Sequence, residues 1–343
     1  MISAGSRPAS LKRSQASEIA PLSRASAAIS VAMLMSNPNQ AKPVALIAGP
    51  TASGKTALAL SLAARHDVTI INADSAQVYA NLPILSAQPS AAELASAPHR
   101  LFGYLDGREV CSAARWAKDA LAEIERAWAE NRVPVLVGGT GLYLRTLLDG
   151  ISPIPEIDAE IRGAVRKLET VDARLMLETE DPASAAALDP NDDNRIKRAL
   201  EVIRSTGKSI IAWREIREGG IGGAIDLRPL LLLPPRDWLY DRCNQRFENM
   251  IEAGALAEVA ALKEAKLPAD APVLRAIGVP ELTALQNGTL TRAQAIELGQ
   301  IATRQYAKRQ YTWFRNQSPG HWPRWTAAYN DSEFPEIETI LQF

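Results

Sequence analysis

Cysteine and histidine are scarce in this sequence. Its 343 residues include 2 cysteines, Cys111 and Cys243, and 3 histidines. Two cysteines so far apart form neither a disulfide framework nor a zinc site, and the histidines add no spacing typical of a metal centre. A reducing, cytoplasmic location is therefore expected.

An excess of basic charge and long apolar runs are also lacking. The net charge is −1, so a uniformly basic nucleic-acid-binding surface is excluded, and any RNA contact has to come from local clusters of cations. The apolar run 27–35 is interrupted by Ser30 and is too short to span a bilayer. With 47% hydrophobic and 22% charged residues, the composition is that of a globular protein, and a monomer without a membrane partner is expected.

Four segments differ in their pattern. Residues 1–40 are rich in Ser and Ala, and we expect a disordered extension, which a transit peptide or a start codon placed too early would equally explain. Residues 41–155 alternate short apolar runs with helical periods, which predicts a parallel α/β core. Residues 156–225 show helical periods alone and are predicted to form a helical insertion domain, and residues 226–343 to return to the core with C-terminal helices.

Individual elements follow from hydrophobic periodicity. From residue 238 onward only helices are expected, including a long helix over 292–316 that begins with a capping box at Thr291 and Gln294. Buried strands are predicted over 44–48, 68–72, 133–137 and 230–233, and helices over 56–64 and 113–130.

A glycine-rich segment between the first strand and the next helix fits the P-loop pattern. Its backbone amides, together with the helix N-terminus, are suited to surround phosphate oxygens. Lys55 adds a positive charge, and the Thr56 hydroxyl is suited to bind Mg²⁺. The predicted fold is therefore a P-loop NTPase-like α/β core, with these diphosphate-binding residues: Gly49, Pro50, Thr51, Ala52, Ser53, Gly54, Lys55 and Thr56.

A carboxylate follows the second predicted strand. Asp74 lies at the carboxyl end of strand 68–72, the edge at which ligands bind in open α/β sheets. It is suited to act as a general base or a metal ligand, although an aspartate that only caps the following turn would look the same. Strand 133–137, in contrast, ends in Gly-Gly-Thr-Gly without the acid that holds Mg²⁺ in a standard NTPase. An ATP-dependent kinase and an RNA-binding protein with a vestigial P-loop remain as alternatives.

The ordered motifs resemble the bacterial tRNA dimethylallyltransferase family. They cover about residues 44 to 316, and the zinc finger of eukaryotic members is absent. Segment 84–89 departs from the family pattern, because the lysine usual there is missing. The motifs that carry the resemblance are Gly49–Thr56, Ile71–Tyr79, Val137–Tyr143, Asp189–Asp192, Arg195–Gly207, Ala302–Gln305 and Lys308–Gln310.

The resemblance implies transfer of a dimethylallyl group from dimethylallyl diphosphate to the exocyclic amine of the adenosine beside the anticodon of tRNA. Lys55 and the loop amides would neutralise the leaving diphosphate with Mg²⁺ as cofactor, and Asp74 would accept the proton of the amine. Thr140 would contact the same adenosine. No phosphoryl transfer is then needed, which explains the missing acid after strand 133–137.

The resemblance also implies an RNA surface. Residues 298–330 contain no acid but several cations with interleaved aromatics, a composition suited to phosphates and unstacked bases. Arg304, Lys308, Tyr311 and Arg315 are expected to share one helix face. The full set of predicted tRNA-binding residues is Asp74, Ser75, Ala76, Gln77, Thr140, Arg162, Arg195, Arg198, Arg275, Arg304, Lys308, Arg309 and Arg315.

Three further charged or polar groups receive structural interpretations. Glu201 is expected to pair with Arg198 and Arg204, and His99 is expected to be structural. Arg242 and Arg246 are interpreted as ordinary surface arginines beside a buried helix stripe, although one of them could reach the diphosphate.

Overall fold

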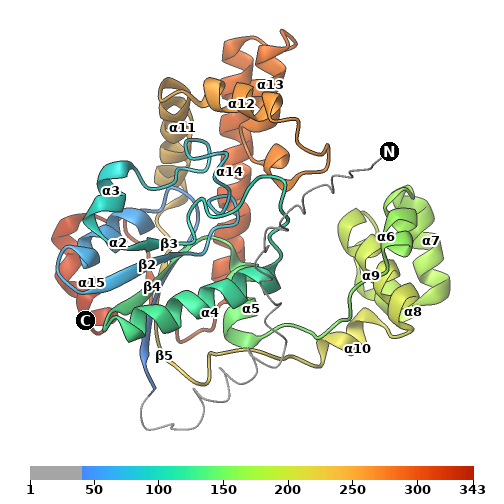
Figure 1. The fold of residues 1–343 in the computed structure, drawn as a ribbon, viewed down its shortest axis with the longest axis horizontal. Coiled ribbons are helices and arrows are strands. Elements are labelled where there is room, and N and C mark those ends of the chain that lie inside the picture. Colours follow the sequence, from blue (N-terminus) through green and yellow to red (C-terminus); the bar gives the residue numbers. More distant parts are fainter. Residues whose placement is uncertain (1–40) are drawn as a thin grey trace, which may run out of the picture.

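A six-stranded parallel sheet forms the centre of the computed structural model, which describes residues 41–343 (Figure 1). The expectations for residues 1–40 lie outside the described residues. The strand order is β3-β2-β4-β1-β5-β6, and each neighbouring pair runs parallel, which confirms the predicted α/β class. The strands are β1 (Pro43–Ala48), β2 (Val68–Asn72), β3 (His99–Arg100), β4 (Val133–Gly138), β5 (Asp226–Leu232) and β6 (Arg324–Trp325).

Both edges of the sheet differ from the sequence-based prediction. The edge strands β3 and β6 have 2 residues each and were not predicted, because so short a segment carries no detectable alternation. The prediction that only helices follow residue 238 is wrong, since β6 pairs with β5 through Leu231 and Leu232. Strand β5 also begins earlier than predicted, at Asp226.

Helices cover both faces of the sheet because alternate residues of its strands point to opposite sides. Val44, Leu46 and Ala48 of β1 belong to one hydrophobic cluster, which includes residues of α4, α5, α11 and α14. Ala45 and Ile47 belong to the cluster on the other face, with α2 and α15. The helices of the core are α2 (Lys55–Ala63), α3 (Ala91–Ser96), α4 (Ala113–Ala129), α5 (Gly141–Asp149), α11 (Arg236–Glu252), α12 (Ala255–Glu264), α13 (Val279–Gln286), α14 (Arg292–Gln317) and α15 (Phe334–Ile340), with 3-10 turns at Pro272–Arg275 and Asp331–Glu333.

The segment between α5 and β5 forms a helical lobe with a hydrophobic core of its own. Every buried member of that core lies between Ile157 and Ile210. The two connections to the sheet meet at Ile151 and Glu218, whose backbones exchange two hydrogen bonds of 3.0 Å each. The lobe consists of α6 (Ala159–Arg166), α7 (Thr170–Glu180), α8 (Pro182–Ala187), α9 (Asp193–Thr206) and α10 (Ile210–Arg214).

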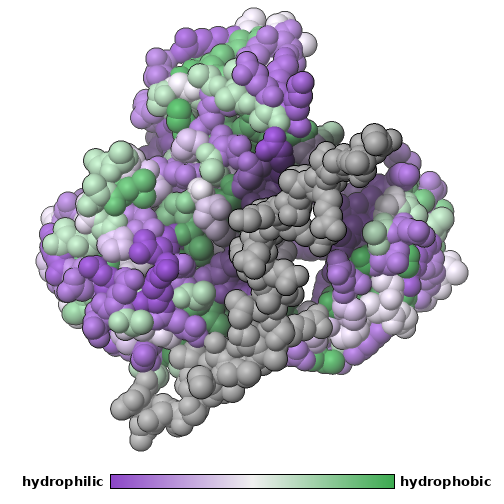
Figure 2. Space-filling model, viewed as in Figure 1, coloured by the Kyte–Doolittle hydropathy of each residue, from purple (hydrophilic) through white to green (hydrophobic). Residues whose placement is uncertain are grey.

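A second lobe stands above the sheet and contains α12, α13 and the first half of α14 (Figure 1). The surface of both lobes on the face shown in Figure 2 is mainly hydrophilic. Among residues 41–343, none of the helices combines the length and the apolar character needed to cross a membrane. Helix α14 runs from the second lobe down to the sheet and so connects this lobe with the sheet.

Candidate active site

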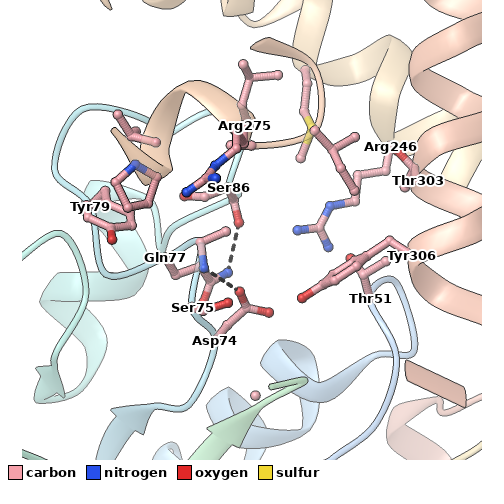
Figure 3. A pocket seen from close by; sticks show the side chains of 18 of the residues that line it. Thr51, Asp74, Ser75, Gln77, Tyr79, Ser86, Arg246, Arg275, Thr303 and Tyr306 are labelled. Atoms are coloured by element: carbon pink, nitrogen blue, oxygen red, sulfur yellow. Dashed lines mark hydrogen bonds between the residues drawn. The ribbon is translucent and has the colours of Figure 1, made fainter. Parts of the chain in front are cut away.

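A cavity of about 430 Å³ lies at the carboxyl edge of the sheet, where β1, β2 and β4 end. Figure 3 shows side chains from separate parts of the chain converging on it. The polar residues of its lining include Thr51, Lys55 and Thr56 after β1, Asp74, Ser75 and Gln77 after β2, Arg246 of α11, Arg275 of the Pro272–Arg275 turn, and Thr303, Tyr306 and Arg309 of α14.

The loop after β1 leaves no room for a side chain at its start. A Cβ at Gly49 would lie 2.4 Å from the carbonyl oxygen of Leu232, so only glycine lets β1 and β5 stay paired there. The buried Ser53 hydroxyl has no hydrogen-bond partner among residues 41–343. A buried polar group without a partner is costly, and an anion bound in the loop would supply an acceptor.

Lys55 is the most perturbed cation of the loop. Its Nζ donates to the carbonyl oxygen of Pro50 at 2.6 Å, at the base of the cavity. Burial disfavours the ammonium and outweighs the favourable charge of Asp74, and with the repulsion of nearby Arg246 it lowers the pKa of Lys55 to about 8. A bound anion would restore the full charge.

Asp74 is held in a fixed orientation by its neighbours. Its Oδ1 accepts the N–H of Ala76 at 2.9 Å, and its own N–H donates to the side chain of Asn72 at 2.8 Å. Asn72 is itself fixed, because Trp116 Nε1 donates to its carbonyl oxygen at 2.9 Å. Only one carboxylate oxygen has a backbone partner among the described residues, and Figure 3 shows the carboxylate facing the cavity opposite Tyr306.

Thr140 is bonded to the loop that carries Asp74. Its hydroxyl accepts the N–H of Ser75 at 2.9 Å and donates to the Ser75 hydroxyl at 3.2 Å. Ser75 lines the cavity, and the Tyr306 hydroxyl lies beside both of these hydroxyls. Contact of Thr140 with the adenosine stays a prediction.

Arg246 is an essential part of the cavity that sequence reasoning placed wrongly. It points into the cavity from α11, and the nearby Asp74 charge favours its guanidinium. Burial lowers the pKa of Arg246, since the surroundings desolvate its charge. Arg242 lies one turn earlier, is exposed, and donates from its Nε to the carbonyl oxygen of Ala52 at 3.1 Å. The interpretation as a surface arginine is therefore wrong for Arg246 but not for Arg242.

Tyr306 is a second residue that the sequence did not single out for the cavity. Its hydroxyl lies beside those of Thr140 and Ser75, and burial raises the pKa of the phenol, with the Asp74 charge adding to the rise. The phenol therefore stays protonated and can donate a hydrogen bond within the cavity.

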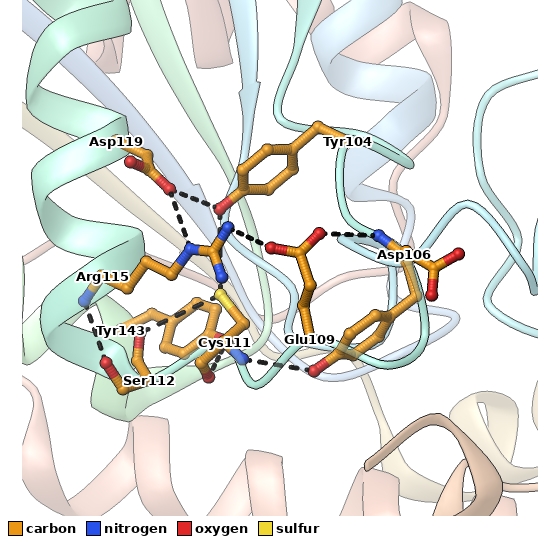
Figure 4. A network of polar contacts seen from close by, with 9 residues as sticks. Tyr104, Asp106, Glu109, Cys111, Ser112, Arg115, Asp119 and Tyr143 are labelled. Carbon is orange, nitrogen blue, oxygen red and sulfur yellow. Dashed lines mark hydrogen bonds and ion pairs between the residues drawn. The ribbon is translucent and has the colours of Figure 1, made fainter. Parts of the chain in front are cut away.

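A polar network fixes the wall formed by the segment before α4 (Figure 4). Arg115 pairs with Glu109 at 2.7 Å, and Tyr104 donates to Asp119 at 2.8 Å. Between them, Cys111 donates its N–H to Tyr79 and accepts from Tyr143 through its carbonyl oxygen. These contacts hold two cavity-lining tyrosines in place. Both cysteines of the chain are free thiols.

The departure from the family pattern at 84–89 removes no charge from the cavity. Gln88 stands at the place of the missing lysine, and its Nε2 donates to the carbonyl oxygen of Tyr79 at 2.7 Å. The same segment is held by Gln77, whose Nε2 donates to the carbonyls of Ser86 and Ala87. Gln88 therefore stabilises the loop beside the cavity but does not line the cavity itself.

The cations of α14 separate into different groups. Arg309 lines the cavity and Lys308 and Arg315 are exposed, but Arg304 bonds to the side chain of Asn244 on α11. Tyr311 shares a helix face with Arg304, since both contact α11, but its hydroxyl donates to the carbonyl oxygen of Leu233 at 3.4 Å and so points toward the core. Arg275 lines the cavity from the opposite side.

The predicted arginines of the insertion lie away from the cavity. Arg162 is on α6 and Arg195 and Arg198 are on α9, so the structure does not bring them to the residues that line it. Glu201 is buried and pairs with Arg198 and Arg166 at 3.3 Å each. The expected pair with Arg204 is wrong, because Arg204 binds Glu180 instead.

His99 has a structural position, as expected. Its Nδ1 bonds to the carbonyl oxygen of Ala97 at 2.9 Å, and burial lowers its pKa. The described residues contain no cluster of three or more His, Cys, Asp or Glu side chains able to hold a metal ion. A divalent cation in this cavity would therefore take oxygen ligands from Thr56 and a bound anion, which are ligands of the kind that Mg²⁺ prefers.

The sequence is similar to a known enzyme family and to several of its members. The sequence model of the IPP transferase family matches residues 77–317. The chain is 57% identical to the tRNA dimethylallyltransferase of Sphingopyxis alaskensis, over 82% of this chain and 92% of the relative, and 47% identical to that of Zymomonas mobilis, over 89% and 97%.

Solved structures give the same result. The fold is similar to the tRNA isopentenylpyrophosphate transferase of Bacillus halodurans, with a TM-score of 0.62 and 31% identity over 88% of this chain and 97% of that one. It is also similar to a eukaryotic dimethylallyltransferase acting on tRNA, with a TM-score of 0.69 and 29% identity over 80% of this chain and 70% of that one.

Proposed function

The chain belongs to the IPP transferase family, and we propose that it transfers a dimethylallyl group from dimethylallyl diphosphate to the exocyclic amine of the adenosine 3′ to the anticodon in tRNA. One observation carries the proposal: a diphosphate cradle and a carboxylate suited to act as a base line the same cavity. The reaction needs the diphosphate site at C1 of the dimethylallyl group and the base at the amine nitrogen that bonds to this carbon. We further propose that the enzyme acts in the cytoplasm as a monomer.

The donor's diphosphate is bound by the loop after β1. An allylic C–O bond breaks readily when the charge that develops on the departing oxygens is neutralised. Lys55 and Arg246 supply two cations from opposite sides of the cavity, and the loop amides and Ser53 supply hydrogen-bond donors. Thr56 would hold Mg²⁺, which when bound supplies further positive charge to the same oxygens.

The acceptor adenine enters beside Asp74 and must leave its stack to do so. Its exocyclic nitrogen forms a bond to C1 of the dimethylallyl group as the bond from C1 to the diphosphate oxygen breaks. The electron pair of the broken bond leaves with the diphosphate, and the proton of the nitrogen passes to the Asp74 carboxylate. Tyr306, which stays protonated, is positioned to donate a hydrogen bond beside this carboxylate.

A direct assay tests the proposal. The purified protein is incubated with an anticodon stem-loop, radiolabelled dimethylallyl diphosphate and Mg²⁺. The label should pass to the RNA, and one diphosphate should be released for each transfer without ATP consumption. ATP hydrolysis without transfer of the label would favour a kinase, and RNA binding with neither reaction would favour a non-catalytic RNA-binding protein.

The donor KM is expected to depend on the charge of Lys55. The pKa of Lys55 in the free enzyme is about 8, and a bound diphosphate raises it because it favours the ammonium. Binding therefore takes up a proton above pH 8. The KM for dimethylallyl diphosphate should be constant below pH 8 and rise by up to about tenfold per pH unit above it. Initial rates between pH 6.5 and 9.5 at saturating RNA measure this.

The control is the Lys55→Arg variant, whose guanidinium stays charged over this range. It is expected to bind the donor less well at every pH but without the rise above pH 8. A wild-type KM that stays flat up to pH 9.5 would contradict the assignment of Lys55.

The exposed cations of α14 are expected to contact RNA phosphates. A variant carrying Lys308→Ala, Arg309→Ala and Arg315→Ala should bind the stem-loop more weakly, and log K should depend less steeply on log[salt]. If each cation contacts one phosphate of a single-stranded segment, the slope should decrease in magnitude by about 2. The slope is measured by filter binding at salt concentrations from about 50 to about 300 mM, a range that includes the physiological value.

Arg324 offers a matched control for charge. Its guanidinium donates to the carbonyl oxygens of four residues, Ser318, Pro319, Gly320 and Trp322. The Arg324→Ala variant should therefore melt at a lower temperature without a change in the salt slope. An equal change of slope in both variants would indicate that the slope reports net charge and not contacts of α14.

A further inference from the structure

Gln310 is a buried polar side chain of α14 whose amide is used at both ends. Its Oε1 accepts the N–H of Thr51 at 2.8 Å, and its Nε2 donates to the carbonyl oxygen of Gly139 at 2.9 Å. The residue is 6% exposed, so water does not compete for these bonds. Its nitrogen and oxygen are assigned unambiguously, because one partner is a donor and the other an acceptor.

The two partners of Gln310 belong to the two loops that the proposed reaction has to align. Thr51 is part of the loop that would hold the diphosphate. Gly139 immediately precedes Thr140, which bonds to the Ser75 backbone and so to the loop that carries Asp74. The Thr140 N–H also donates to the carbonyl oxygen of Ala73 at 3.1 Å. One amide group therefore connects the donor loop to the loop of the base.

The fit at Gly139 leaves no space for movement of the amide. A Cβ at this position would lie 2.2 Å from Gln310 Nε2 and 3.0 Å from the carbonyl oxygen of Gly49. Hence the approach of α14 to the loop is set by this hydrogen bond, and a glycine is needed to allow it.

We propose that Gln310 is a positioning residue that sets the separation between the leaving diphosphate and the base Asp74. The inference rests on the proposed function. Gln310 touches neither substrate, so its loss should leave binding of each substrate nearly intact and reduce the rate of the bond-forming step. A misplacement of about 1 Å costs on the order of 100-fold in rate.

The first test is the Gln310→Glu variant, compared with the wild type at each pH. When ionised, the new carboxylate can accept from Thr51 but repels the carbonyl oxygen of Gly139. When protonated, it can again do both, and burial raises its pKa into the range of the assay. At pH 8.5 the kcat of the variant should therefore be about 100-fold lower than that of the wild type. The two values should approach each other as the pH falls to 6.

Other titrating groups do not confuse this ratio. The ionisable side chains on the elements around Gln310 are common to both proteins. They include Lys55 of the donor loop, Asp74 after β2, Arg236, Arg242, Cys243 and Arg246 of α11, and Tyr306, Arg309 and Tyr311 of α14 itself. The matched control is Gln317→Glu, the same chemical change at an exposed position of the same helix. Its kcat should follow that of the wild type at every pH.

A second test is independent of charge. Gly139→Ala should reduce kcat, because the added Cβ displaces the Gln310 amide, and combining it with Gln310→Ala should restore part of the loss relative to Gly139→Ala alone. Such a positive coupling in a double-mutant cycle is expected only if the two residues act on each other.

Three results would overturn the proposal. They are a pH-independent ratio for Gln310→Glu, a loss that appears in KM for either substrate with kcat unchanged, and loss of the folded state, measured by thermal melting, in both the Gln310→Glu and Gln310→Met variants. If the wild type itself transfers no label, the proposed function fails. The role of Gln310 in fixing the donor loop is then tested by deuterium exchange of the backbone amides of residues 49–54. Exchange should be faster in Gln310→Met than in the wild type, and equal exchange would contradict this role.

Discussion

Replacing Asp74 by asparagine is expected to lower kcat by about 1,000-fold, within the range that general bases contribute. Asparagine has nearly the same shape and can still accept the N–H of Ala76 through its side-chain oxygen. What it loses is the ability to take a proton from the exocyclic amine. The affinity for the stem-loop should change by less than about threefold, because the substitution removes a negative charge near RNA and leaves the cations of α14 in place.

The matched control for Asp74 lies at the other end of the same strand. Asp67 precedes β2 and its side chain is 87% exposed, so Asp67→Asn removes the same charge from the edge of the sheet that lacks the cavity. It should leave kcat within about twofold, as surface substitutions usually have small effects. Single-turnover transfer of labelled dimethylallyl groups measures both variants. A near wild-type rate for Asp74→Asn would exclude this carboxylate as the base.

Removing either buried cation should reduce transfer by about 100- to 1,000-fold in kcat/KM, as for donors that stabilise a developing negative charge. Lys55→Met and Arg246→Met each keep much of the side chain's length but leave part of the departing diphosphate without a partner. Because charge on the oxygens increases as the C–O bond breaks, most of the loss should appear in kcat. The two cations face the same group, so the double variant should lose less than the product of the single effects.

Inorganic diphosphate separates this explanation from a general loss of structure. It should bind to each variant more weakly than to the wild type, as measured by inhibition of transfer or by titration calorimetry, whereas the stem-loop should bind equally. Arg292→Met is the control, since Arg292 is the first residue of α14 and pairs with Glu252 at the surface. Unchanged diphosphate affinity in Arg246→Met would show that this guanidinium does not contact the leaving group.

The sequence was informative where one local segment determines the structure. The glycine-rich loop, strand β2 and Asp74 lie within 30 residues of one another, and their spacing alone predicts a phosphate site beside a carboxylate. The capping box at Thr291 likewise predicted the start of α14, where the structure shows both of its hydrogen bonds. These signals depend on backbone geometry that neighbouring residues impose.

Residues that reach the cavity from distant helices could not be predicted in the same way. Arg246 follows the buried Cys243 on α11 and precedes Phe247, so it borders the apolar stripe, but periodicity does not show what lies opposite that border. Tyr306 and Gln310 face inward from a helix in which polar residues occur on every side. Their positions depend on how α14 crosses the sheet, which is a tertiary property.

The insertion leaves and rejoins the rest of the chain at the Ile151–Glu218 bridge, and every fully buried residue of its apolar core lies within Ile157–Ile210. Its two ends are thus neighbours, and a turn of a few residues could join them without bending β5 or α5. The lobe is in this sense a replaceable module: it can change in length, composition or charge while the sheet and the cavity at its edge keep their geometry.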